Sequence, residues 1–128
     1  MIDSSCWIAY LYNRDEKHES ALQLLPIFLK NKRHMTDYAI IEVANFLLRK
    51  SGAHASREAF ELLTSSQKQE VIYNDKLSFN ATKEIHSKSP ELSFTDANMI
   101  LHMQRLGLKE ILSFDAGFDK VSGIKRIK

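Results

Sequence analysis

Residues 110–119 read EILSFDAGFD, a short apolar run that stops at Asp115 and is followed four residues later by a second acid, Asp119. An aspartate is common in turns, because its side chain accepts hydrogen bonds from nearby backbone N–H groups. The same pattern stands at the N-terminus, where Met1-Ile2 runs into Asp3. Because two apolar runs each end on an acid, we expect Asp3 and Asp115 to stand there for the same reason.

The 128 residues are enough for one domain with a sizeable core, and we expect residues 1–128 to form a single domain. A hydrophobic fraction of 44% and a charged fraction of 27% are ordinary for a globular protein. The net charge of +2, with a pI near 8.7, permits contact with nucleic acid without requiring it. Cys6 is the single cysteine, and we expect it to be a buried core residue. The absence of an intrachain disulfide and of a long apolar run is typical of a cytoplasmic protein.

Alternating strands and helices indicate an α/β fold. The spacing of apolar residues predicts helices over Ile8–Leu11, Glu19–Leu29, Asp37–Lys50, Ser56–Leu63, Leu77–Ser87 and Thr95–Leu106, and strands over Glu70–Tyr73, Glu110–Phe114 and Ile124–Ile127. Pro26 lies inside the second helical pattern and should kink or break it. We expect a mainly parallel central sheet of about four to five short strands, flanked by helices.

In such sheets, ligands bind beyond the carboxyl ends of the strands, and Asp3 and Asp115 both follow strand-like runs. Two other acids can join them. Glu42 lies between apolar neighbours in a helix, so it is either on the solvent edge or partly buried and functional. Asp96 stands at a helix start, where the alternative to a functional role is a capping box with Ser93.

The four acids together predict a site for a hard divalent cation. Mg²⁺ and Mn²⁺ bind through carboxylate oxygens and keep several waters. A bound ion lowers the pKa of a water nucleophile and neutralises charge that develops on a phosphate oxygen. Each acid alone has an ordinary structural explanation. Clustered carboxylates repel one another without a metal, however, so the set favours metal-assisted hydrolysis.

Four motifs occur in order along nearly the whole chain: Asp3-Ser4-Ser5, Glu42 in its helix, Leu92–Ala97 around Asp96, and Ser113-Phe114-Asp115 with Phe118 and Gly123-Ile124 after it. They resemble the motifs of the PIN domain family, most of all its VapC-type toxin ribonucleases. Any one motif is weak, but the four together at these separations are fairly specific. The resemblance implies a three-layer α/β/α arrangement.

The resemblance also implies an endoribonuclease that depends on Mg²⁺ or Mn²⁺, with one or two ions bound by Asp3, Glu42, Asp96 and Asp115. Ser5 and Ser113 would be hydroxyls that orient these acids, their alternative role being to cap a helix start or a turn. Asp119 is a further candidate ligand for a second ion, and its alternative is an exposed helix acid.

For partners, the resemblance implies an RNA substrate, a homodimer and an antitoxin protein that covers the acidic cleft, with no membrane involved. Arg14, Lys17 and Arg49 are candidates for phosphate contacts, although each also fits ordinary surface charge. The family usually has several apolar residues before its first aspartate, and here only Met1-Ile2 precede it. Either the first strand is very short or the native chain extends before Met1.

Two other functions stay open. One is a nuclease of the same chemistry that matures ribosomal RNA or cuts single-stranded DNA, and the other is a catalytically inactive PIN-like binding module. Missing acids would mark the inactive module, and all four acids are present. A zinc hydrolase is disfavoured because the 5 histidines show no paired ligand spacing, and a Walker-type nucleotide-binding loop because the 4 glycines are isolated.

Overall fold

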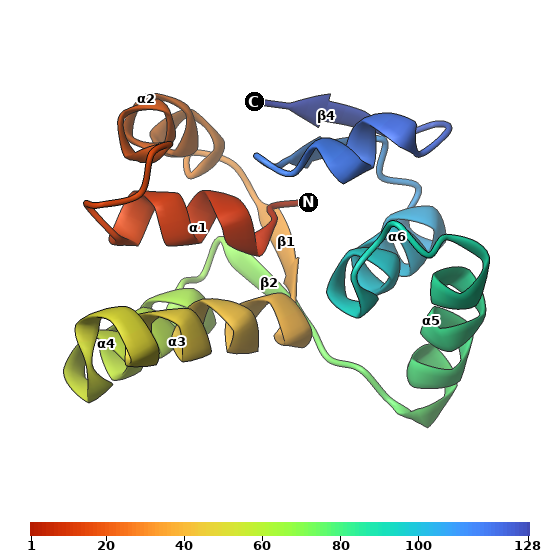
Figure 1. Ribbon diagram of the computed structural model, residues 1–128, viewed down its shortest axis with the longest axis horizontal. Coiled ribbons are helices and arrows are strands. Elements are labelled where there is room, and N and C mark those ends of the chain that lie inside the picture. Colours follow the sequence, from red (N-terminus) through yellow and green to blue (C-terminus); the bar gives the residue numbers. More distant parts are fainter.

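The computed structural model describes all residues, 1–128, as a helix-rich α/β fold with short parallel strands. In chain order the elements are α1 (Ser4–Leu11), α2 (His18–Phe28), β1 (Arg33–Thr36), α3 (Asp37–Ser51), α4 (Ala53–Ser65), β2 (Gln69–Ile72), α5 (Lys76–Lys88), α6 (Phe94–Leu106), β3 (Glu110–Leu112), the 3₁₀ helix η1 (Ala116–Lys120) and β4 (Lys125–Ile127). Figure 1 shows α1, α3 and α4 on one side of β1 and β2, with α5 and α6 on the other side.

The strands form two parallel two-stranded sheets, β1 with β2 and β3 with β4. Ile2 lies between the sheets: its N–H donates to the carbonyl of His34 in β1 at 3.0 Å, and it forms a parallel bridge with Leu112 in β3. The N–H of Asp3 donates to the carbonyl of Leu112 at 2.9 Å. The prediction of a parallel α/β fold is therefore confirmed. The single sheet of about four to five strands is not formed, because Met1–Asp3 make one bridge rather than a strand.

Most predicted elements agree with the structure to within three residues, but α1 begins at Ser4 rather than Ile8, and two elements, η1 and β1, were not predicted. β1 was not predicted, because Arg33-His34-Met35-Thr36 has no strand-like alternation and forms a strand only through its pairing with β2. The helix α2 runs through Pro26 without the break that was one of the two expected outcomes. The carbonyl that loses its N–H donor there belongs to Leu22, an exposed residue, so water can replace the missing bond.

One hydrophobic core cluster of 18 buried residues spans both sheets and most helices, and its largest side chains include Trp7, Leu25, Met35, Ile40 and Phe118. Cys6 belongs to this core, as expected. Burial of its thiol and the nearby Asp3 charge raise the pKa of Cys6 to about 12, so the thiol stays protonated at neutral pH. None of the helices combines the length and the apolar character needed to cross a membrane.

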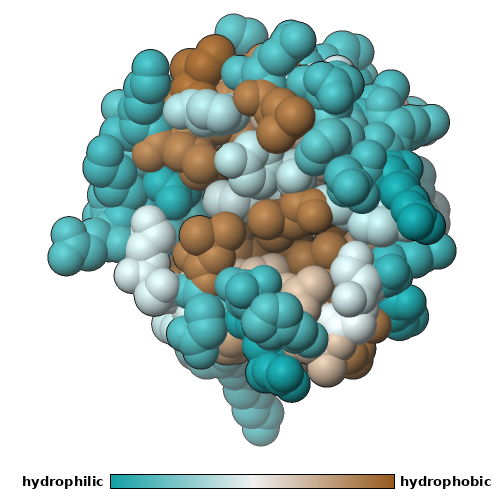
Figure 2. All heavy atoms as spheres, turned by 90° about the vertical axis from the view of Figure 1, so that its left-hand side faces the viewer, coloured by the Kyte–Doolittle hydropathy of each residue, from teal (hydrophilic) through white to brown (hydrophobic).

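Apolar side chains also reach the surface. Figure 2 shows them among hydrophilic ones on the face that lies at the left of Figure 1, where the ends of several helices meet. A mostly apolar hollow of about 370 Å³ opens between α1, α3 and α4, with Leu11, Leu47 and Leu62 in its wall. None of the four candidate acids lines this hollow, so it is separate from the site that they form.

The position of Ile2 between the two sheets can be tested by truncation. Ile2 is 1% exposed, so Ile2→Ala should lower the free energy of unfolding by about 2–5 kcal/mol through lost burial and a residual cavity. Ile41→Ala is the matched control, since Ile41 is 47% exposed and should change stability by less than about 1 kcal/mol. Urea unfolding of both variants measures the difference. Equal losses would contradict the central position of Ile2.

Candidate active site

Asp3 is buried where the two sheets meet and is 2% exposed. The hydroxyls of Ser5 and Ser113 both donate to its Oδ2, Ser113 at 2.7 Å, and Ser4 Oγ lies 3.3 Å from its Oδ1. Burial raises the pKa of Asp3, and the hydroxyl hydrogen bonds oppose that rise. Although Asp3 stands at the N-cap position of α1, its side chain makes no capping bond to the helix. Its carboxylate is therefore held by side chains from two ends of the chain.

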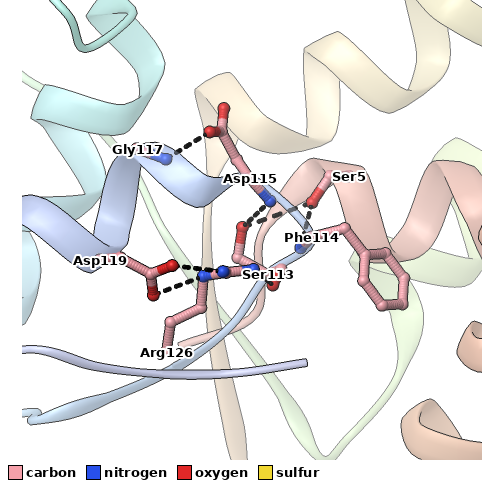
Figure 3. A network of polar contacts seen from close by, with 7 residues as sticks. All are labelled: Ser5, Ser113, Phe114, Asp115, Gly117, Asp119 and Arg126. Carbon is pink, nitrogen blue, oxygen red and sulfur yellow. Dashed lines mark hydrogen bonds and ion pairs between the residues drawn. The ribbon is translucent and has the colours of Figure 1, made fainter.

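The same two hydroxyls fix the segment after β3, as Figure 3 shows. Ser5 Oγ accepts a hydrogen bond from the N–H of Phe114 at 3.0 Å, and Ser113 Oγ accepts one from the N–H of Asp115 at 2.9 Å. Each hydroxyl thus donates to Asp3 and accepts from the backbone that carries Asp115. The positions of Ser5 and Ser113 allow them to orient both acids.

Glu42 approaches from α3. Thr95 Oγ1 donates to its Oε1 at 2.8 Å, and Ser4 Oγ lies 2.8 Å from its Oε2. Because a hydroxyl has one proton and Ser4 Oγ is nearer to Glu42 than to Asp3, Ser4 donates to Glu42 and separates the two carboxylates. Glu42 is half-buried with both oxygens bound, so it does not simply face solvent.

Asp96 makes the capping box that was its structural alternative: its carboxylate accepts from the N–H of Ser93 at 3.0 Å, and its own N–H donates to Ser93 Oγ at 3.1 Å. The side chain is also buried, with 8% of the residue exposed. Burial, and next the negative charges of Asp3 and Asp115, raise the pKa of Asp96 to about 6. Asp96 is therefore both a helix cap and a member of the acidic group.

Asp115 is exposed and caps η1, its Oδ1 accepting from the N–H of Gly117 at 2.7 Å. Asp119 points elsewhere (Figure 3). Its two oxygens pair with Nε and Nη2 of Arg126, which lowers the pKa of Asp119. The Arg126 side chain is 4% exposed and also donates to the carbonyl of Ser113 at 3.3 Å. Asp119 is thus directed at a buried guanidinium rather than at the other acids.

The structure links Asp3, Glu42, Asp96 and Asp115 through shared hydroxyls and mutual charge. As the side chains stand, no group of three or more His, Cys, Asp or Glu residues is close enough to hold a metal ion. The available donors are carboxylate and hydroxyl oxygens, which is the chemistry that Mg²⁺ and Mn²⁺ prefer. The donor types fit a hard cation, and the carboxylates of Asp96 and Asp115 are bound to backbone N–H groups.

Three residues of this network were not predicted from the sequence: Ser4, Thr95 and Arg126. Ser4 and Thr95 each adjoin a candidate acid, so a search for hydroxyl residues beside acids would have found them. Arg126 lies in the C-terminal basic cluster, and nothing in the sequence distinguishes it from its neighbours.

The PIN domain family matches residues 1–124 of the chain. The fold is similar to the crystal structure of VapC20 from Mycobacterium tuberculosis, a toxin that cleaves the sarcin-ricin loop. The TM-score is 0.80 at 22% sequence identity, and the similarity covers 89% of this chain and 88% of that chain. At this identity the similarity concerns the fold. No curated protein matches the chain.

The raised pKa of Asp96 predicts how stability depends on pH without metal. Between the unfolded value of 3.8 and the folded value of about 6, the folded state keeps a proton that the unfolded state releases. The bound proton stabilises the folded state, and this contribution is lost as the pH rises through about 6. The amide oxygen in Asp96→Asn can accept the same bond from Ser93, so in EDTA we expect this variant to match wild type near a pH of about 4. At a pH of about 7 it should be more stable by about 1–3 kcal/mol.

Urea unfolding in EDTA at several pH values measures this difference. Glu84→Gln is the matched control, because Glu84 is an exposed acid on α5 and its removal should leave the pH dependence unchanged. A lower stability of Asp96→Asn at neutral pH, with the pH dependence of wild type, would show that Asp96 is only a cap.

Proposed function

Because the chain belongs to the PIN domain family, we propose that residues 1–128 form one nuclease domain that hydrolyses RNA phosphodiester bonds with the help of Mg²⁺ or Mn²⁺. The observation that carries this proposal is the buried Asp3 carboxylate, held by the hydroxyls of Ser5 and Ser113 and linked to Glu42 through Ser4. A protein gains no stability from gathering carboxylates that repel one another, which favours a functional reason for the group.

In this proposal one or two ions are held by Asp3, Glu42, Asp96 and Asp115. When bound, the ion supplies an activated water and neutralises charge on the phosphate. Ser5 and Ser113 keep Asp3 in a fixed orientation, and Ser4 and Thr95 do the same for Glu42. Asp119 takes no part as a ligand, since its carboxylate neutralises Arg126.

The charge of the acidic group also determines how RNA can approach. Four carboxylates repel a phosphodiester, so the backbone of RNA comes close only where cations compensate. A protein cation placed among the same carboxylates would block the site without any new chemistry. Because the four motifs resemble those of VapC-type toxins and the fold is similar to that of VapC20, we propose that the protein is the toxin of a toxin–antitoxin pair. It would form a homodimer and be inhibited by an antitoxin segment that inserts a basic side chain among the acids.

The nuclease proposal predicts RNA cleavage that requires Mg²⁺ or Mn²⁺ and stops in EDTA. Asp115→Asn should reduce the cleavage rate about 100-fold or more, because a lost ligand removes several kcal/mol of charge stabilisation from the transition state. Asp115 is exposed, so this variant should fold normally, and Glu84→Gln is the control that should cleave like wild type. Gel assays with structured and unstructured RNAs measure the rates. Full cleavage in EDTA, or activity with zinc alone, would contradict the proposal.

The toxin proposal predicts that expression of the protein slows the growth of a bacterial host. Asp96→Asn should relieve the effect at an equal protein level, whereas Glu84→Gln should remain toxic. Co-expression of a small protein from a neighbouring reading frame should restore growth and yield a complex with the wild-type chain. Growth curves together with quantitative blots measure this. Equal toxicity of wild type and Asp96→Asn would show that the toxicity does not come from nuclease activity.

A further inference from the structure

Two adjoining hollows share Phe114 in their walls, and the first of them also includes Asp115. The first has a volume of about 330 Å³ and includes Ser5, Asp15, Glu16 and Asp115 in its wall. The second, of about 350 Å³, is lined by Lys17, Ser20, Phe114, Ala116, Arg126 and Lys128. Phe114 and Lys17 belong to both walls. We call the first the acidic hollow and the second the basic hollow.

The two hollows differ in charge. Three acidic side chains line the acidic hollow against one lysine, and no acidic side chain lines the basic hollow. Within the basic hollow, Arg126 is committed to Asp119 and to the carbonyl of Ser113. Lys17 and Lys128 are exposed and neither forms an ion pair. These two lysines are therefore the cations available to an anionic ligand.

Phe114 is held on a rigid backbone next to the acids. Its N–H is bound to Ser5 Oγ, and the residues on either side of it are fixed by the Ser113 hydroxyl. In Figure 3 the ring points away from this hydroxyl network. The ring is half-buried against the core, and it does not belong to any of the aromatic pairs of the structure. One part of the ring thus packs, and another faces the two hollows without an aromatic partner.

We propose that Phe114 is a stacking platform for an unpaired base of the RNA substrate, and that Lys17 and Lys128 hold the phosphate of that nucleotide in the basic hollow. This inference rests on the proposed nuclease function and adds a substrate class to it. An aromatic ring accepts any base, because every base has a π face, but the base must first leave its own stack. The site therefore takes single-stranded or looped RNA, with the stacked nucleotide next to the phosphodiester that meets Asp115.

Binding in EDTA tests this proposal without using cleavage. The probe is a fluorescent single-stranded RNA of about eight nucleotides, measured by anisotropy at low salt, with a blunt duplex of the same sequence for comparison. Phe114→Leu keeps an apolar side chain against the core and should weaken single-strand binding by about 5- to 100-fold. Phe114→Trp should bind like wild type. Tyr73→Leu is the control, since Tyr73 is 71% exposed in the segment after β2 and its loss should change nothing.

The lysines have their own readout, the salt dependence of the same binding. The slope of log K against log salt, where K is the association constant, is negative. Lys17→Ala and Lys128→Ala should each make it less steep by about 0.7, the value for one phosphate contact with a single strand. Lys88→Ala removes an exposed lysine from α5 and should leave the slope unchanged.

The outcomes separate this inference from the nuclease proposal. Equal binding by wild type and Phe114→Leu, tighter binding of the duplex, or no binding of single strands by wild type would each overturn the stacking platform. Loss of binding in Phe114→Leu supports it even if no RNA is cleaved with Mg²⁺, a result that would contradict only the nuclease. Cleavage by wild type with unchanged binding in Phe114→Leu would leave the nuclease and remove the platform.

Discussion

The buried carboxylate of Asp3 is the constraint on which the rest of the structure depends. A charge at this depth is tolerated only if hydrogen bonds replace its lost water, and serine hydroxyls supply them. Ser5 lies at the start of α1 and Ser113 lies 110 residues after Asp3, so solvating one carboxylate joins the two ends of the chain. The backbone hydrogen bonds that join Met1–Asp3 to both sheets lie next to this carboxylate. The fold and the candidate site are thus stabilised by the same few residues.

Much of this was predictable from the sequence. The helices follow from apolar spacing, and α3 is the clearest case because its stripe of buried residues includes Ile40, Val43 and Leu47. The acids at strand ends were predictable because parallel strands place their carboxyl ends at one edge. β1 was not predictable, since the pairing with β2 that makes it a strand is a tertiary effect. Pairing also determines that Met1–Asp3 join two small sheets instead of completing one.

Within the site, the sequence predicted which acids to examine but not what each one contacts. Asp96 and Asp119 show the difference, because both are acids in the first turn of a helix with an equally plausible structural role. Asp96 is buried near two other carboxylates, which raises its pKa to about 6, whereas Asp119 finds Arg126 and its pKa falls. A sequence gives the type of side chain, and only the fold determines whether its neighbour is an acid or a guanidinium.

The contacts of Arg126 explain why its buried guanidinium does not pair with the nearby candidate acids. Its guanidinium uses two donors on Asp119 and another on the carbonyl of Ser113, whose hydroxyl binds Asp3. The ion pair with Asp119 compensates the burial of the cation, so Arg126 need not turn toward Asp3 or Asp115. It instead anchors β4 to the segment that carries Ser113 and Phe114. Because this ion pair is internal, the other four acids have no paired protein cation, which is a condition for the proposed metal site.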